Sequence, residues 1–198
     1  MEHRDAQVTI VMGKNGTGKS TFCQKIIDGV GDRALVVTLN GAPKIWREYP
    51  MVDVADKKQM NFKKGIAQCW FMQHDDDTYE YIYKNFSKGI LIFDDCRGYL
   101  GSNVDQHIWF KRLLMDFRHK MLDLYFVCHT PSDVPSRIWG FASDIFVGAT
   151  DALFPKGRIS TTSSDQIIEA QRIVNQQFRI AKDRNDGTHY GMFKRIRS

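Results

Sequence analysis

The sequence lacks the features that mark membrane-spanning and secreted proteins. No stretch approaches the roughly 20 consecutive apolar residues that a membrane-spanning helix needs, and residues 1–5 contain no apolar segment like that of a signal peptide. We therefore expect no membrane span and a location in the cytoplasm. Internal repeats and low-complexity tracts are also missing. With 198 residues and 42% hydrophobic content, the chain can bury one substantial core, and we predict a single domain over residues 1–198.

Paired cysteines are missing as well. The four cysteines stand singly in apolar or helical stretches, with no CxxC pair and no spacing typical of metal ligands. We interpret them as buried structural thiols, and they are Cys23, Cys69, Cys96 and Cys128. The formal charge of +5 and a sequence pI near 9.0 fit a polyanionic partner. Charge alone does not identify one, because many basic proteins bind no nucleic acid.

Apolar runs alternate along the chain with stretches whose apolar residues recur at helical spacing. The sequence predicts strands at residues 7–12, 34–39, 66–72, 89–93, 124–128, 145–147 and 189–196, with a further candidate edge strand at 52–54. It predicts helices at residues 21–27, 75–86, 104–120 and 163–182. The three acids at 75–77 favour the solvated first turn of a helix over a metal site. Strands that alternate with helices predict an α/β fold, with a mainly parallel sheet sandwiched between helices.

A complete Walker A loop connects the first predicted strand to the first predicted helix. Residues 13–20 read Gly-Lys-Asn-Gly-Thr-Gly-Lys-Ser. The backbone amides of residues 14–19 are expected to wrap the β- and γ-phosphates, while the Lys19 ammonium group reaches their oxygens and the Ser20 hydroxyl holds Mg²⁺. We predict a P-loop ATPase that uses ATP and Mg²⁺. The predicted nucleotide-binding residues are Gly13, Lys14, Asn15, Gly16, Thr17, Gly18, Lys19, Ser20 and Thr21.

Two adjacent carboxylates follow the most strand-like run, residues 89–93. A magnesium–nucleotide site needs a further carboxylate near the loop, and the carboxyl end of a buried neighbouring strand is where such a sheet presents one. We assign Asp94 to Mg²⁺, mostly through water, and Asp95 to orienting and deprotonating the attacking water. The alternative is that both are solvated acids of a turn.

Polar and basic residues border the next predicted strand. His129 follows that strand, at a position from which a side chain can sense the γ-phosphate or the attacking water, although a lone histidine is usually structural. Arg118 precedes the strand and is by default a surface charge. Arg97 and Arg112 are the other candidate cations for the site.

The order of these segments resembles the FtsK/HerA superfamily of P-loop ATPases. The resemblance covers roughly residues 7–150 and depends on GKNGTGKS at 13–20, ILIFDD at 90–95, and Arg118 before a strand that ends at His129. It looks closest to zonular occludens toxin-like proteins and to the small genome-packaging ATPases of membrane-containing viruses. The resemblance implies a RecA/ASCE-like fold and a homo-oligomeric ring that couples ATP hydrolysis to movement of double-stranded DNA. It also implies that an arginine of one subunit completes the neighbour's site, and Arg118 matches that finger by position.

Two positions depart from the family pattern. The family commonly has glutamate where this chain has Asp95 and glutamine where it has His129. A shorter carboxylate places the base differently, and histidine adds a pH dependence near neutrality. Slow or partner-dependent hydrolysis is therefore left open.

The resemblance predicts a viral genome-packaging motor, located in the host cytoplasm or the virion and docked on a capsid or membrane portal protein. An export ATPase of the zonular occludens toxin type is an alternative, but those proteins typically carry a membrane span. A small-molecule kinase and a nucleotide-gated assembly factor are further alternatives. Basic residues near the C-terminus would add phosphate contacts to DNA. They are Arg172, Arg179, Lys182, Arg184, Lys194, Arg195 and Arg197.

Overall fold

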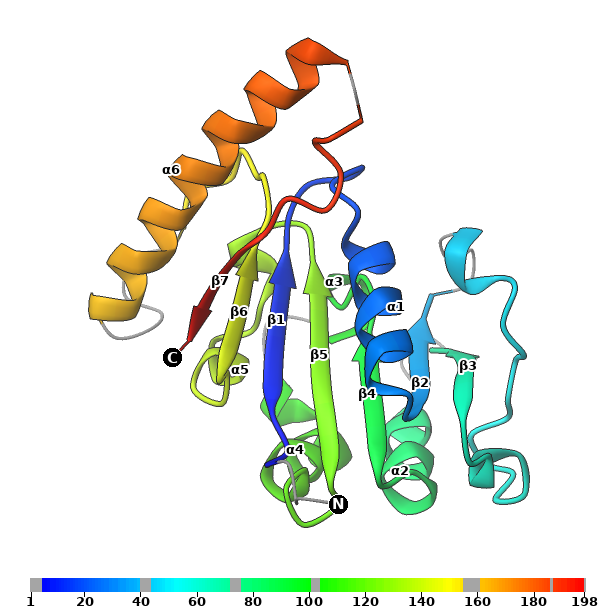
Figure 1. The fold of residues 1–198 in the computed structure, drawn as a ribbon. Coiled ribbons are helices and arrows are strands. Elements are labelled where there is room, and N and C mark those ends of the chain that lie inside the picture. The colour runs from blue at the N-terminus through cyan, green and yellow to red at the C-terminus, as the bar shows by residue number, and fades with distance from the viewer. Residues whose placement is uncertain are drawn as a thin grey trace.

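The chain folds around a seven-stranded sheet (Figure 1). A computed structural model describes residues 5–39, 44–71, 76–100, 104–154, 161–185 and 187–197. The strands are β1 (Val8–Met12), β2 (Arg33–Thr38), β3 (Gly65–Trp70), β4 (Gly89–Phe93), β5 (Leu122–Cys128), β6 (Asp144–Val147) and β7 (Lys194–Arg197). Their order is β3-β2-β4-β5-β1-β6-β7, and only β7 runs antiparallel to its neighbour. The predicted α/β fold with a mainly parallel sheet is confirmed.

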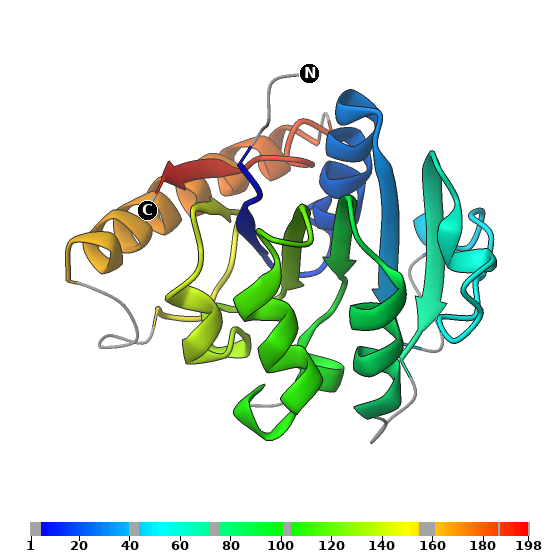
Figure 2. The ribbon, with the colours of Figure 1, turned by 90° about the horizontal axis from the view of Figure 1, so that it is seen from below.

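Helices cover both faces of the sheet (Figure 2). The α-helices are α1 (Lys19–Val30), α2 (Asp76–Asn85), α3 (Arg97–Leu100), α4 (Ile108–Asp116), α5 (Ser136–Trp139) and α6 (Thr161–Arg184). Short 3₁₀ segments are η1 (Lys44–Trp46), η2 (Gln59–Asn61), η3 (Val104–Gln106) and η4 (Pro131–Asp133). Helix α1 lies on one face, α2 and α4 lie on the other, and α6 lies beside β6 and β7 at one edge.

The alternation of side chains along each strand builds two cores, one on each face. In β5, Leu124 and Phe126 join the core beneath α2 and α4, whereas Tyr125 and Val127 join the smaller core beneath α1. Because helices cover both faces of the sheet, every residue of β1 and β4 is buried, including the polar Thr9. No helix in the described part of the chain is long and apolar enough to cross a membrane.

Several predicted element boundaries are corrected by the structure. The helix predicted at 104–120 is interrupted by the extended residue His107 and ends at Asp116, and the chain then turns through Met121, whose φ of 53° is left-handed. The strand predicted at 189–196 is reduced to β7, because residues 187–193 form an irregular loop instead. The edge strand predicted at 52–54 is only a single bridge, from Met51 to Gln68.

The remaining predicted strands and helices agree with the observed ones to within three residues at each described end. All four cysteines are free and buried. Residues 72 and 75, predicted to end a strand and to begin a helix, lie outside the described residues.

Candidate active site

Glycines shape the loop between β1 and α1. Gly16 and Gly18 have φ values of 78° and 84°, a region that disfavours residues with a β-carbon. At Gly13 an added β-carbon would lie 2.8 Å from the Thr17 hydroxyl oxygen. That hydroxyl is buried and donates to the Lys14 carbonyl at 2.9 Å, which closes the loop on itself. The backbone therefore curls around the start of α1, where helix N–H groups favour anions.

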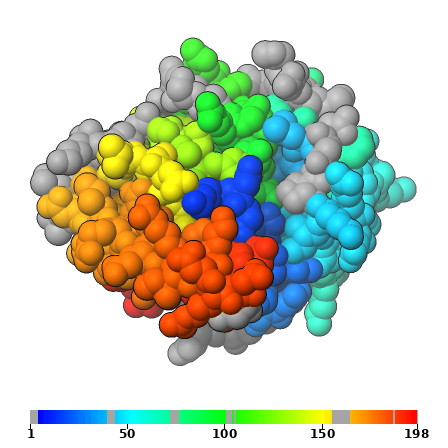
Figure 3. Space-filling model, turned by 90° about the horizontal axis from the view of Figure 1, so that it is seen from above, coloured from blue at the N-terminus to red at the C-terminus, as the bar shows by residue number. Residues whose placement is uncertain are grey.

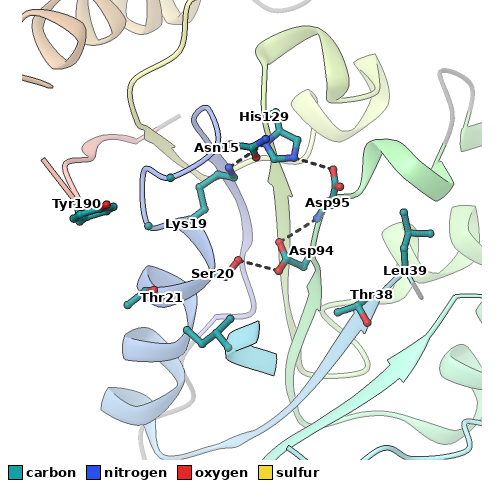
Figure 4. A pocket seen from close by; sticks show the side chains of 13 residues that line it. Asn15, Lys19, Ser20, Thr21, Thr38, Leu39, Asp94, Asp95, His129 and Tyr190 are labelled. Carbon is teal, nitrogen blue, oxygen red and sulfur yellow. Dashed lines mark hydrogen bonds and ion pairs between the residues drawn. The ribbon is translucent and has the colours of Figure 1, made fainter. Parts of the chain in front are cut away.

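A cavity of about 640 Å³ opens beside the loop and brings most of the predicted site residues together (Figure 4). The predicted residues that line it are Asn15, Gly16, Gly18, Lys19, Ser20, Thr21, Asp94, Asp95 and His129. Gly13, Lys14 and Thr17 shape the loop behind it. Four lining residues were not predicted as site residues, and they are Thr38, Leu39, Ile45 and Tyr190.

Asp94 reaches the loop from a strand that is not the neighbour of β1. Strand β5 lies between β4 and β1, which corrects the expectation of an adjacent strand. The Ser20 hydroxyl nevertheless donates to Asp94 Oδ2 at 3.0 Å, and the Trp46 indole N–H donates to the same oxygen. Burial raises the pKa of the Asp94 carboxyl, although these hydrogen bonds and the charge of Lys19 oppose the shift.

Ser20 and Asp94 offer the hard oxygen donors that Mg²⁺ prefers. Within the described residues, no group of three or more histidine, cysteine or acidic side chains is arranged to hold a metal. The fit is therefore to an ion that takes one hydroxyl and one carboxylate from the protein and its other ligands from phosphates and water, as Mg²⁺ commonly does. Both oxygens face the cavity next to the loop (Figure 4).

His129 connects Asp95 to the P-loop lysine. Its Nε2 lies 3.2 Å from Asp95 Oδ1, and its Nδ1 lies 3.2 Å from Lys19 Nζ. Because a lysine ammonium can only donate, Nδ1 must accept and Nε2 must carry the proton given to Asp95. Lys19 also donates to the carbonyls of Gly13 and Lys14, at 2.6 and 3.2 Å.

The electrostatics of these groups follow from burial and pairing. The hydrogen bond from His129 is the main cause that lowers the pKa of Asp95, and the charges of Lys19 and Arg97 add to it while burial opposes it. Burial lowers the pKa of Lys19, and the charge of Asp94 is the largest opposing effect. Asp95 therefore stays ionised at neutral pH. Its left-handed backbone, with φ of 51°, turns it away from the direction of β4, and its side chain remains half exposed.

The candidate arginines lie at different distances from the cavity. Arg118 precedes β5, whereas His129 follows it, so roughly 20 Å of strand separates them. Arg118 is exposed at the amino end of a central strand, rather than at a lateral edge of the sheet. Arg112 stacks over Trp109 on α4, 4.7 Å from the ring centre. Arg97 pairs with Asp133 at 3.3 Å and is the only one of the three whose charge acts on Asp95.

The contacts of Trp46 and Tyr190 were missed in the sequence. Trp46 lies in a segment with no clear pattern, and its bond to Asp94 spans 48 residues. Tyr190 lies in a segment predicted to be a strand. Neither belongs to a local motif, so only the tertiary fold reveals that they reach the site.

The sequence matches no protein-family model and no curated protein. The fold, however, is similar to solved structures. Genome packaging NTPase B204 from Sulfolobus turreted icosahedral virus 2, in complex with AMPPCP, is 16% identical over 85% of this chain and 86% of that chain, with a TM-score of 0.65. B204, the DNA-packaging ATPase from Sulfolobus turreted icosahedral virus, is 13% identical over 87% and 89%, with a TM-score of 0.66.

A weaker likeness, with a TM-score of 0.46, is to the N-terminal domain of zonular occludens toxin from Neisseria meningitidis, 16% identical over 75% of this chain and 79% of that one. The two neighbours with TM-scores of 0.65 and 0.66 are genome-packaging ATPases, one of the two groups that the sequence resembles. At these identities the B204 structures establish the fold alone, and this chain has a P-loop NTPase fold.

Proposed function

We propose that the protein hydrolyses ATP and couples hydrolysis to the movement of double-stranded DNA, as a motor that packages a viral genome. One observation supports the proposal of hydrolysis: five side chains suited to it line one cavity. They are Lys19, Ser20, Asp94, Asp95 and His129. A loop that only bound phosphate would not need an ionised carboxylate held beside its lysine.

The loop amides and Lys19 bind the β- and γ-phosphates, and Ser20 with Asp94 holds Mg²⁺ through oxygen ligands. When bound, the ion neutralises charge that develops on the phosphate oxygens. Asp95 orients a water molecule and accepts its proton as the water oxygen bonds to the γ-phosphorus. The bond from that phosphorus to the β–γ bridging oxygen breaks, and ADP is the leaving group. His129 fixes the direction of the Asp95 carboxylate through their 3.2 Å contact. The lowered pKa of Asp95 makes it a weak base, which fits slow hydrolysis in the protein alone.

Exposed basic residues support the DNA part of the proposal. B204 is described as a genome-packaging protein, but a shared fold does not transfer a function by itself. Three basic side chains, Arg179, Lys182 and Arg184, are exposed in the last turns of α6 and offer phosphate contacts. We further propose a homo-oligomeric ring that docks on a viral capsid or membrane portal protein.

ATP turnover with and without duplex DNA tests the function. A motor should be stimulated by DNA, and the stimulation should weaken as salt rises because phosphate contacts release counterions. Lys19→Ala, which loses a charge contact that backbone amides cannot replace, should abolish turnover in both conditions. Unstimulated turnover that requires a nucleoside or metabolite acceptor would identify a kinase. Tight binding with almost no turnover would identify a nucleotide-gated assembly factor.

A further inference from the structure

We propose that Tyr190 is the stacking surface for the base of the bound nucleotide. The inference rests on the proposed function, since it requires that the cavity binds a nucleoside triphosphate. It assigns base recognition to the C-terminal loop, defined here as residues 187–193. This loop comes from the far end of the chain and belongs to no nucleotide-binding motif.

The direction of the nucleotide follows from the groups along the cavity. Asp95 and His129 lie on one side of the P-loop, Tyr190 lies on the other, and Lys19 and Thr21 lie between them (Figure 4). The γ-phosphate belongs beside Asp95 and His129, where the attacking water would be held. The nucleoside must therefore leave the loop at the opposite side, past Thr21. That is where Tyr190 lines the cavity.

The C-terminal loop is anchored directly on the P-loop. The Gly191 N–H donates to the Thr17 carbonyl at 2.9 Å. At Gly18, an added β-carbon would lie 3.1 Å from the Gly191 nitrogen, so the two backbones approach as closely as glycine allows. In the view onto the carboxyl ends of the strands, blue atoms of the P-loop region adjoin red atoms of the C-terminal segment (Figure 3). Tyr190 is thus held at a fixed place relative to the phosphates.

The Tyr190 ring is both supported and open. It packs on the His189 ring at 4.1 Å between centroids, and His189 meets Phe178 of α6 edge-on at 5.5 Å. Tyr190 nevertheless remains 61% exposed. Single exposed aromatics are common, so exposure alone means little. A braced ring with free surface inside a nucleotide cavity is, however, what a base stacks on.

Leu39, an apolar side chain that also lines the cavity, is less suited to this role. Leu39 and Thr38 lie on the side of the two aspartates (Figure 4). A base placed there would put the γ-phosphate away from Asp95 and His129. The direction of the phosphates therefore favours Tyr190 over Leu39.

Binding of Mg²⁺-ATP and of Mg²⁺-tripolyphosphate, measured by calorimetry, tests the inference. Tyr190→Ala should weaken ATP binding roughly tenfold or more, the range typical of lost base stacking. It should leave tripolyphosphate binding unchanged, because that ligand has no base. Tyr190→Phe should keep most of the ATP affinity. Tyr81→Ala, which removes an exposed tyrosine from α2, serves as the matched control and should change neither ligand.

Two results would overturn the stacking role. Equal losses for ATP and tripolyphosphate would mean that Tyr190 acts through the shape of the P-loop, and undiminished ATP binding in Tyr190→Ala would mean that the base lies elsewhere. A wild-type protein that binds neither ligand would instead refute the proposed function, and the inference with it. Because tripolyphosphate reports on the loop alone, the two failures are distinguishable.

Discussion

Asp94 and Asp95 are adjacent in sequence, yet they meet opposite environments. Asp94 is 4% exposed and accepts hydrogen bonds from Ser20 and Trp46, whereas Asp95 is half exposed and paired with His129. The left-handed turn at Asp95 separates the two side chains. The division of labour that we propose, Asp94 for metal and Asp95 for water, would therefore follow from the backbone conformation at the end of β4.

Substitution of each carboxylate by its amide should separate these roles. Asp95→Asn keeps the size and one oxygen but loses the base, so ATP should still bind while hydrolysis falls by about a hundredfold or more. Asp94→Asn should reduce turnover, and it should also make ATP binding less dependent on Mg²⁺. Binding and single-turnover hydrolysis at several Mg²⁺ concentrations would measure both. Full hydrolysis in Asp94→Asn would show that the assignment of the two residues is wrong.

The two pKa shifts also predict opposite pH dependence of stability. The pKa of Asp94 is raised above its ordinary value of 3.8, so the folded state holds that proton more tightly than the unfolded chain. This contribution is present below the ordinary pKa and is lost as pH rises through the raised value. Asp94→Asn has no carboxyl group to titrate, so its stability relative to wild type should increase as pH rises from 3.8 through the raised pKa of Asp94.

Asp95→Asn is the matched comparison, because the pKa of Asp95 is lowered. Wild type gains this contribution above the ordinary pKa and loses it as pH falls through the lowered value. The stability of Asp95→Asn relative to wild type should therefore decrease as pH rises. That decrease falls between the lowered pKa of Asp95 and the ordinary value of 3.8, so denaturant unfolding of the nucleotide-free proteins must be measured below about pH 4 as well as above it. The same trend in both variants would contradict the two environments.

The helices, strands and loops that depend on local chemistry could be predicted from the sequence. Residues close together in the chain determine the P-loop, the buried strands and the carboxylates after β4. These parts of the site could therefore be predicted. The Lys19–His129 contact joins residues 110 apart, and Trp46 and Tyr190 reach the cavity from segments with no motif. Such contacts depend on strand order and loop packing, which hydrophobic periodicity does not specify. The loop at 187–193 was misread as strand because its bond to Thr17 replaces the ladder of a sheet edge.

Arg195 of β7, which was expected to contact DNA, instead pairs with a carboxylate of the protein. Arg195 donates to both carboxylate oxygens of Asp144, at 2.7 and 2.9 Å, and Asp144 is 4% exposed. This pair fastens β7, and the C-terminal loop before it, to β6. Arg195 is thereby less available to phosphate than the exposed residues of α6.

Loss of Arg195 should leave the Asp144 carboxylate buried without its cation. We expect Arg195→Ala to lower the free energy of unfolding by about 1–3 kcal/mol. Arg197→Ala, which removes another exposed arginine from the same strand, should change it by less than about 0.5 kcal/mol. Combining Arg195→Ala with Asp144→Asn should recover part of the loss, because no charge then remains buried. Equal effects of the two arginines in denaturant unfolding would show that the pair contributes little.

At the scale of the whole molecule, the sheet separates two ends with different roles. The P-loop, both aspartates and His129 lie at the carboxyl ends of the parallel strands, and Arg118 lies at the amino end of β5. Arg118 cannot reach the cavity of its own chain. If it acts in catalysis, the amino end of one subunit must face the carboxyl end of the next, which is a head-to-tail contact of the kind that closes into rings.

The final prediction is that Arg118 acts across such a contact. Phosphoryl transfer to water builds charge on the phosphate oxygens, and an arginine supplied by a neighbour can accelerate it by about a thousandfold or more. Arg118→Ala should therefore bind ATP normally but hydrolyse it poorly. Mixing Arg118→Ala with Lys19→Ala is decisive, because some interfaces in a mixed ring then pair an intact P-loop with an intact arginine. Turnover should partly return on mixing. If mixed rings form and stay inactive, the finger is another residue, and Arg97, whose charge already acts on Asp95, becomes the first candidate.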